Sequence, residues 1–427
     1  MPMVESPFEE VSPGFRPARA WRMSNDEEPA EHPPWPINWR LIGKISLLVI
    51  SLLLLLLAIR YLTRPPTFYR VKTFVGSDIA LFPARQGFLL REKENVFVLH
   101  DWKRGDECWR VFIDVPSFTP ITYSLAPDGN YFAALTVILT QIHLLLWQNG
   151  KLISDTALAP MYRAHLKVMD DGRAFVWSST PLTDALLLQK GKVIARGRLL
   201  DEHYSAISPD GSSMLAFTHN TGFEYGLITV KNRELALTKQ NAVQDPCTLR
   251  QFEGYILDIN LFNNGVLLAN TGTVFDSAGQ RGNTTGWQHE SIAPGGVFAY
   301  EHRNTHARVF SPVTGDSWTF TVPEQQNVGD ATMNGRYALV YYHRSPPKQL
   351  RMLFNALPVL APLYKQEMLA LYERPGRLRA ELSLDIKTWW AKRSEPWEWW
   401  WYPSPDGHAI AFNIADRSTS KCLLFRW

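Results

Sequence analysis

Several residue types and motifs are scarce in this chain of 427 residues, and each scarcity excludes a class of protein. Three cysteines are too few for a disulfide scaffold, and their spacing is not typical of a zinc site. A formal net charge of +3 provides no basic excess, which argues against a dedicated nucleic-acid-binding protein. The chain also lacks a Gly-x-Ser-x-Gly nucleophile turn and a phosphate-binding loop. We therefore expect no nucleic-acid partner, no metal and no cofactor.

The first forty residues are rich in proline and acidic side chains and poor in apolar ones. Such a segment cannot bury enough apolar surface to offset the entropy lost on ordering. Residues 1–40 are therefore predicted to be a disordered tail.

A continuous apolar run follows the tail, from Ile45 to Ile59, and is interrupted only by two serines. Lys44 and Arg60 flank this run and can extend their charges toward the two membrane interfaces. As a helix, residues 41–62 would measure about 33 Å, against roughly 30 Å for the hydrocarbon core of a bilayer. We therefore predict a single transmembrane helix over 41–62 that anchors the chain in a lipid bilayer.

The side of the membrane on which the remaining chain lies is less clearly indicated. The positive-inside rule weakly favours the cytoplasm, because slightly more basic residues follow the apolar run than precede it. A short tail followed by an anchor and a large domain is, however, commonly inserted with the domain outside. We favour an extracytoplasmic location for the domain.

The remaining sequence contains a repeated turn followed by a short apolar strand. The clearest copies are Ser208–Phe217 and Ser404–Phe412, and each begins with Ser-Pro-Asp-Gly. Proline presets φ, aspartate bonds the backbone of its own turn, and glycine accepts positive φ. Weaker copies bring the number of turns to eight, and most are spaced by about forty residues.

Second hairpins follow several of these turns, for example at 142–153 and 185–195. Four short strands in each forty-residue repeat are typical of a β-propeller blade. We predict an all-β fold, a seven- or eight-bladed β-propeller over 74–427, preceded by a linker or closing strand at 63–73. Because the chain ends on a strand, a segment near Tyr69–Val75 is expected to complete the last blade.

These repeats resemble those of membrane-anchored TolB-like and WD40-like propellers, in which a Ser-Pro-Asp-Gly turn introduces an inner strand. A second resemblance, to the Gly-x-x-x-Trp hairpins of quinoproteins, lies in 98–111 and, with shorter spacing, in 310–320. Ser311 stands where the second quinoprotein hairpin would have aspartate, and paired vicinal cysteines are absent. The resemblance implies a propeller without resolving its family, and propellers host many unrelated functions.

Two segments are candidates for partner binding. One is rich in tryptophan; if it forms a strand, Trp397, Trp399 and Trp401 share one face and Trp400 lies on the other. Aromatic surfaces of this kind bind sugars, membranes or proteins, although such side chains can equally fill the space between blades. The other is a predicted insertion near 344–366, apolar and broken by prolines, whose candidate contact residues are Phe354, Leu357 and Leu360.

No catalytic arrangement emerges from the sequence. His302 and His306 have helical spacing in a region that is not helical, and the aspartates of the turns (Asp128, Asp171, Asp210 and Asp406) have a structural explanation. We therefore favour a non-enzymatic scaffold that holds a protein partner or an envelope polymer at the membrane. The alternatives are a propeller enzyme, either a glycan hydrolase or lyase or a quinoprotein-like oxidoreductase, and a ligand sensor.

Overall fold

The computed structural model describes most of the chain outside the N-terminal tail. The described residues are 39–62, 66–76, 81–116, 119–161, 164–178, 184–198, 205–218, 222–231, 234–243, 260–268, 273–276, 279–283, 287–322, 327–344, 366–384, 398–415 and 420–427. The chain divides into two units, Met1–Arg64 and Pro65–Trp427. Of the tail predicted at 1–40, residues 1–38 lie outside the described residues, and Trp39 and Arg40 begin the helix α1 (Trp39–Leu62).

The described residues of the first unit form the helix α1 (Trp39–Leu62), whose described apolar side chains are exposed. Within the helix residues that the structure describes, no stretch is long and apolar enough to cross a membrane. The crossing of a bilayer by residues 41–62 stays a prediction.

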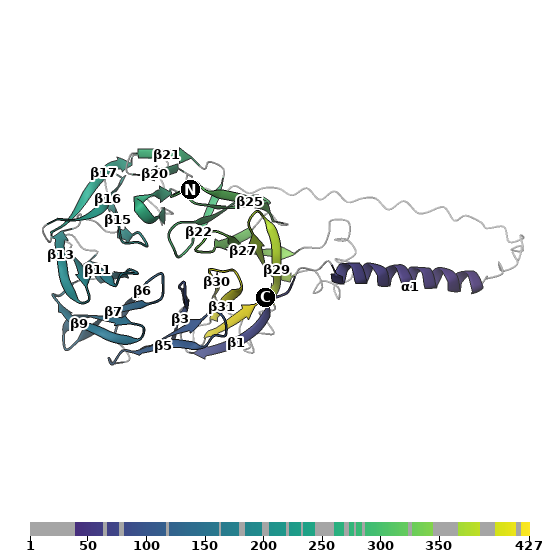
Figure 1. Ribbon diagram of the computed structural model, residues 1–427, viewed down its shortest axis with the longest axis horizontal. Coiled ribbons are helices and arrows are strands. Elements are labelled where there is room, and N and C mark those ends of the chain that lie inside the picture. Colours follow the sequence, from purple (N-terminus) through teal and green to yellow (C-terminus); the bar gives the residue numbers. More distant parts are fainter. Residues whose placement is uncertain are drawn as a thin grey trace, which may run out of the picture. The chain divides into compact units, whose positions relative to one another are not determined.

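The second unit is all-β in its described residues, and within its sheets most strands pair antiparallel with a strand adjacent in the chain (Figure 1). Two four-stranded sheets come first, β2 (Leu81–Pro83), β3 (Gly87–Lys93), β4 (Val96–Asp101) and β5 (Glu107–Phe112), then β6 (Thr122–Leu125), β7 (Tyr131–Ile138), β8 (Gln141–Gln148) and β9 (Lys151–Leu158).

An eight-stranded sheet follows, and it consists of two antiparallel halves. The halves are β10 (Ala164–Val168), β11 (Arg173–Ser178), β12 (Asp184–Gln189) and β13 (Lys192–Arg198), then β14 (Ser205–Ile207), β15 (Ser213–Thr218), β16 (Gly222–Lys231) and β17 (Glu234–Val243). Only one parallel pair, Arg196 with Glu234, joins β13 to β17. Each half therefore has the same strand order as the separate sheets.

Three further four-stranded sheets continue in chain order. They are β18 (Asn260–Leu261), β19 (Leu267–Leu268), β20 (Thr273–Asp276) and β21 (Gly279–Asn283), with the short 3-10 helix η2 (Asn263–Gly265) in the first turn; β22 (Gln288–Ile292), β23 (Ala299–Arg303), β24 (His306–Phe310) and β25 (Ser317–Thr321); and β26 (Asn327–Ala331), β27 (Tyr337–Arg344), β28 (Gln366–Glu373) and β29 (Arg377–Leu384).

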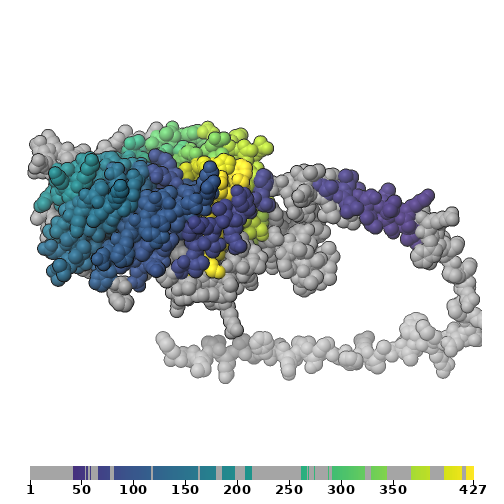
Figure 2. Space-filling model, turned by 60° about the horizontal axis from the view of Figure 1, so that its bottom comes forward, coloured from purple at the N-terminus to yellow at the C-terminus, as the bar shows by residue number. Residues whose placement is uncertain are grey.

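The last sheet joins the two ends of the propeller. Its strands β30 (Glu398–Pro403), β31 (Ala409–Ala415) and β32 (Ser420–Arg426) are completed by β1 (Tyr69–Gly76), which pairs antiparallel with β32 from Tyr69↔Arg426 to Gly76↔Ser420. In Figure 2 the purple residues of β1 lie beside yellow residues near the C-terminus. The predicted closure by a strand near Tyr69–Val75 is therefore confirmed.

The hydrophobic core lies between neighbouring sheets rather than within one sheet. Successive residues of β27 show why, because Leu339 packs toward the last sheet while Ala338 and Val340 pack toward the sheet of β22–β25. A strand covered on both sides needs apolar residues at every position, which explains the continuous apolar runs in the sequence. Similar clusters join β2–β5 to β6–β9, and β6–β9 to β10–β13.

Two tryptophans of the quinoprotein-like hairpins connect neighbouring sheets. Trp109 on β5 donates its indole N–H to the carbonyl of Gly129 in the next sheet at 3.1 Å, and Trp318 on β25 donates to Gly335 at 2.7 Å. The turns before them also match, since Asp101 and Ser311 each accept backbone N–H groups of their own turn. Ser311 therefore caps its turn as Asp101 does, although it stands where the quinoprotein pattern has aspartate.

Closure can be tested at Phe74, which is 7% exposed and packs on β1 between the last and first sheets. Phe74→Ala should lower the free energy of unfolding by about 3–5 kcal/mol, since it leaves a cavity in that core. The measurement is urea unfolding of the full chain in detergent. The matched control is Tyr69→Ala on the same strand, where the side chain is 58% exposed; equal losses in both variants would contradict the closure argument.

Two glycines test the packing of the turns. Gly315 and Gly335 both have positive φ, 78° and 65°, but a Cβ at Gly315 would meet nothing within 4 Å, whereas one at Gly335 would lie 2.4 Å from the Phe298 ring. Gly315→Ala should cost about 1–2 kcal/mol from backbone strain alone. Gly335→Ala should cost a further 1–3 kcal/mol or so from overpacking, and similar unfolding midpoints for the two variants would refute this account.

Candidate functional site

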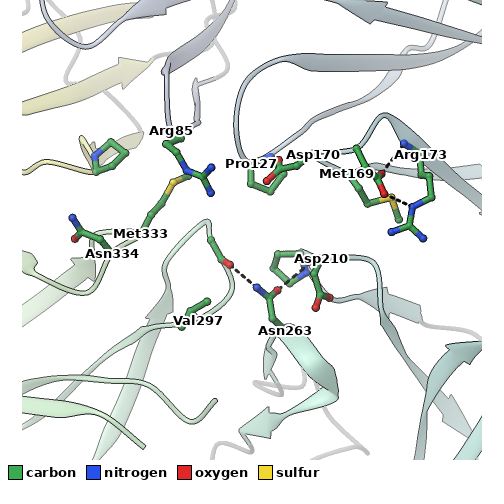
Figure 3. A pocket seen from close by; sticks show the side chains of 14 residues that line it. Arg85, Pro127, Met169, Asp170, Arg173, Asp210, Asn263, Val297, Met333 and Asn334 are labelled. Carbon is green, nitrogen blue, oxygen red and sulfur yellow. Dashed lines mark hydrogen bonds and ion pairs between the residues drawn. The ribbon is translucent and has the colours of Figure 1, made fainter. Parts of the chain in front are cut away.

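The first turn of each four-stranded unit contributes to one central cavity of about 590 Å³ (Figure 3). Because neighbouring strands are antiparallel, these turns all lie at the same end of their sheets, which we call the turn face. The residues that line the central cavity are Arg85, Pro127, Met169, Asp170, Asp171, Arg173, Pro209, Asp210, Asn263, Gly295, Val297, Met333, Asn334 and Pro405.

The predicted Ser-Pro-Asp-Gly turn has the expected internal hydrogen bonds. Ser208 donates its hydroxyl to Asp210 at 2.6 Å and accepts the N–H of Ser213 at 3.0 Å, while Gly211 N–H donates to the Ser208 carbonyl at 2.9 Å. Ser404 and Thr332 repeat this arrangement in their own turns. The motif is therefore a self-capped turn that begins the second strand.

The aspartates of the turns are used within the turns. Asp128 accepts the N–H of Asn130, and Asp406 accepts the N–H of His408, both at the same relative position as in the Asp210 turn. Asp171 accepts both the N–H and the guanidinium of Arg173. These contacts agree with the structural explanation that the sequence suggested for Asp128, Asp171, Asp210 and Asp406.

Hydrogen bonds also link successive turns around the central cavity. Arg85 N–H donates to the Pro127 carbonyl at 2.8 Å, and Asp128 N–H donates to the Asp170 carboxylate at 2.8 Å. Farther around the ring, Asp210 N–H donates to the Asn263 side chain at 3.1 Å. The rim of the cavity is therefore cross-linked between sheets and well suited to present fixed groups to a ligand.

The environment of the cavity shifts the pKa values of its charged groups in different directions. Burial, and then the negative charge of Asp128, raise the pKa of Asp170, although that carboxyl accepts a backbone hydrogen bond. Burial alone would raise the pKa of Asp210, but hydrogen bonds from Ser208 and its neighbours hold it below the usual value. Burial lowers the pKa of Lys167 on β10, despite the favourable charges of Asp170 and Asp210.

A second cavity, of about 460 Å³, lies on the turn face between the last and first sheets, and we call it the seam cavity. It shares Arg85 and Pro405 with the central cavity. Its other lining residues are Gln86, Asp101, Trp102, Lys103, Asp406, His408, Ala409 and Arg426. Sequence reasoning missed this site, because its residues come from opposite ends of the propeller sequence.

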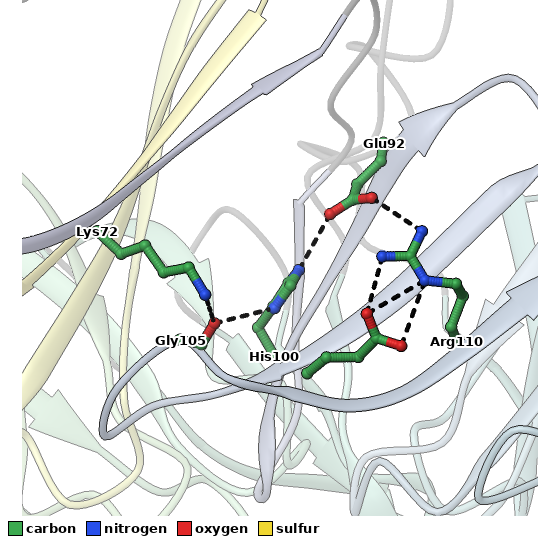
Figure 4. A network of polar contacts seen from close by, with 6 residues as sticks. Lys72, Glu92, His100, Gly105 and Arg110 are labelled. Atoms are coloured by element: carbon green, nitrogen blue, oxygen red, sulfur yellow. Dashed lines mark hydrogen bonds and ion pairs between the residues drawn. The ribbon is translucent and has the colours of Figure 1, made fainter.

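A polar network holds the turn that borders the seam cavity (Figure 4). The Gly105 carbonyl accepts from Lys72 Nζ at 2.6 Å and from His100 Nδ1 at 3.1 Å. His100 is 4% exposed, and its Nε2 lies 3.3 Å from Glu92, which in turn pairs with Arg110. Because Lys72 belongs to β1, the network fastens the closing strand to the first sheet.

The tryptophan segment forms the inner strand β30 of the last sheet. Trp401 is 7% exposed and packs with Trp399 toward the sheet of β26–β29, while Trp400 packs toward the first sheet. The predicted division of the side chains between two faces is thus present, with both faces covered by neighbouring sheets. Trp397 lies outside the described residues, and partner binding by this segment stays a prediction.

The predicted insertion falls between two paired strands. Arg344 ends β27 and Gln366 begins β28, and the two residues pair with each other. Phe354, Leu357 and Leu360 lie outside the described residues. Because Arg344 ends the second strand of its sheet, Arg344 and Gln366 lie at the end opposite the turn face.

The part of the chain that the structure describes contains no group of three or more metal-ligating side chains. His302 and His306 lie on the paired strands β23 and β24, where His302 faces Ala307 and His306 faces Arg303. Their helical spacing therefore has no structural counterpart.

Comparisons with known proteins report similarity of fold only. No protein-family model and no curated protein matches the chain. Among solved structures, the chain is similar to the C-terminal WD40 domain of Sif2 (13% identity, 84% of this chain and 98% of that one, TM-score 0.48) and to the WD40 domain of SCAP from fission yeast (11%, 85% and 97%, TM-score 0.48). A computationally designed protein, Ika8, is similar at 9% identity, 85% and 98% coverage and a TM-score of 0.42.

The assignment of a propeller therefore depends on the chain's own sheets and on their closure. The TolB-like part of the resemblance stays a prediction.

The His100 network predicts a pH dependence of stability. Burial lowers the pKa of His100 below 6.5, and the positive charge of Lys72 lowers it further, whereas Glu92 raises it. Arg110, which pairs with both Glu92 and Glu107, completes the charged surroundings. Below pH 6.5 the unfolded chain therefore binds more protons than the folded one, so the free energy of unfolding should fall as pH falls from about 7 toward 5.

Urea unfolding at several pH values checks this expectation. His100→Gln should remove part of the slope, at most about 1.4 kcal/mol per pH unit for a single group. An unchanged slope in His100→Gln would assign the pH dependence to other residues.

Proposed function

We propose that this protein is an eight-bladed propeller, fixed to a membrane by residues 41–62, whose turn face holds a protein partner or an envelope polymer without catalysing a reaction. The observation that carries the proposal is the central cavity of about 590 Å³, with a rim cross-linked by hydrogen bonds between turns. A rigid, hollow surface of this kind suits binding, since little conformational entropy is lost when a partner docks.

The strand pairing supports eight blades. Six sheets of four strands and one sheet of two four-stranded halves give eight equivalent units. The single pair between Arg196 and Glu234 is a contact between neighbouring outer strands rather than a continuation of one blade.

The use of the turn carboxylates supports a role without catalysis. A glycan hydrolase would need two carboxyl groups facing a shared space, one of them to donate a proton. Asp128, Asp210 and Asp406 instead accept hydrogen bonds from their own turns, and Asp171 is paired with Arg173. Asp170, the cavity carboxyl whose pKa burial raises, accepts the backbone N–H of Asp128 and so also links two turns.

The apolar run from Ile45 to Ile59 supports the membrane anchor, because no polar side chain other than Ser46 and Ser51 interrupts it. Extraction of membranes with alkaline carbonate should leave the intact chain in the pellet and release a chain that lacks residues 41–62. Release of both chains would refute the anchor. Reporters fused after Trp427, one active only outside the cytoplasm and one fluorescent only inside, test the extracytoplasmic location.

Site-specific photo-crosslinking distinguishes the possible partner surfaces. A photoreactive residue at Val297, on the rim of the central cavity, should crosslink the partner, whereas one at Leu139, a residue 92% exposed in the opposite turn of β7 and β8, should not. A third probe at Leu357 tests the insertion. Crosslinking at Leu357 alone would contradict binding at the turn face and would favour the insertion.

A further inference from the structure

The seam cavity contains three cationic side chains that lack acidic partners. Arg85, Lys103 and Arg426 line the cavity, and none of them forms an ion pair within the described residues. The side chain of Arg85 extends over the adjoining central cavity (Figure 3), where its positive charge opposes the rise in the pKa of Asp170. Three cationic side chains against two carboxylates, Asp101 and Asp406, leave the cavity with an excess of positive charge, which favours an anion.

The two acids of the seam cavity are occupied by their own turns. Asp101 accepts the backbone N–H groups of Lys103 at 2.6 Å, Arg104 at 2.7 Å and Asp106 at 2.9 Å. Asp406 accepts the Ser404 hydroxyl at 2.6 Å and the His408 N–H at 3.0 Å. Their lone pairs are directed at these donors, which leaves the cationic groups as the donors that remain for a ligand.

Arg426 provides the most specific observation. One of its terminal nitrogens donates to the Lys103 carbonyl at 3.2 Å, while its Nε is buried and has no hydrogen-bond partner in the described part of the chain. A buried donor left unsatisfied is costly. An oxyanion that binds the guanidinium would neutralise its charge through charge-assisted hydrogen bonds.

The surroundings fix the geometry of the site. His408 stacks on Trp427 with ring centroids 4.9 Å apart, and the Trp427 indole N–H donates to Gly407 at 2.7 Å. On the other side, the Lys72 and His100 contacts to the Gly105 carbonyl hold the turn that carries Lys103. Both walls of the cavity are therefore held by contacts that do not involve the three cations.

We infer that the seam cavity is an oxyanion-binding site, which takes a phosphate or carboxylate group between Arg85, Lys103 and Arg426. The planar fork of arginine matches either group with two parallel hydrogen bonds. The site deepens the proposed function, since it lies on the turn face and would select a partner or polymer that carries such groups. It does not require that proposal, because a small oxyanion can bind even if the partner docks elsewhere.

The test is a titration of the full chain in neutral detergent with inorganic phosphate or succinate, at constant ionic strength set with chloride, followed by calorimetry. Arg426→Gln and Arg85→Gln should each weaken binding by about tenfold or more, the loss expected for a hydrogen bond to a charged group. The matched control is Arg173→Gln, which removes a turn-face arginine that is already paired with Asp171 and should leave oxyanion binding unchanged.

Arg426→Lys separates charge from shape, because it retains the positive charge and loses the fork; it should weaken phosphate less than Arg426→Gln does. Urea unfolding of each variant without added anion shows whether the fold is intact. Binding of phosphate alone would identify a phosphoryl-bearing ligand, and binding of both anions a site that also accepts carboxylates. No binding of either anion beyond that of chloride, or equal weakening by Arg173→Gln, would overturn the inference whether or not the crosslinking experiment finds a partner.

Discussion

The pairing of β1 with β32 is the interaction on which the rest of the propeller depends. Every other sheet is formed from consecutive strands, but the last sheet takes its outer strand from the start of the propeller. Without β1, the apolar residues Cys422 and Leu424 of β32 would lose the Phe74 side chain that packs against them. Closure thus packs the apolar faces of the first and last sheets against each other, and it also creates the seam at which the first and last turns meet.

The same closure explains why sequence reasoning recovered the fold better than the site. Proline, aspartate and glycine at fixed positions identify the turns in the sequence. The strand that completes the last sheet was inferred because the last segment of the sequence is itself a strand. The turn residues are neighbours in the sequence, and the closing strand follows from counting the strands in each repeat. The seam cavity brings Arg85 together with Arg426, and no local pattern connects residues that approach each other only when the ring closes.

The tryptophan segment shows the reverse case, in which a correct local inference does not indicate exposure. Successive side chains of β30 point to opposite faces of the sheet, so Trp399 and Trp401 lie on one face and Trp400 lies on the other. In a propeller, however, both faces of a strand are covered by neighbouring sheets. The sequence cannot distinguish an aromatic platform in solvent from aromatic packing between blades, because both produce the same pattern of residues.

The two ends of the propeller are therefore physically different surfaces. At the turn face, residues such as Ser208, Thr332 and Ser404 fix the first turns through repeated short-range bonds, so the charged groups that remain unpaired there are held in place. At the opposite end, the connections follow the second strand of each sheet, and one of them carries the long apolar segment between Arg344 and Gln366. Rigid polar groups favour recognition of a specific charged ligand, whereas an apolar connection of that length favours contact with another apolar surface. The two ends can be used at once, because the antiparallel strands separate them by the full height of the sheet.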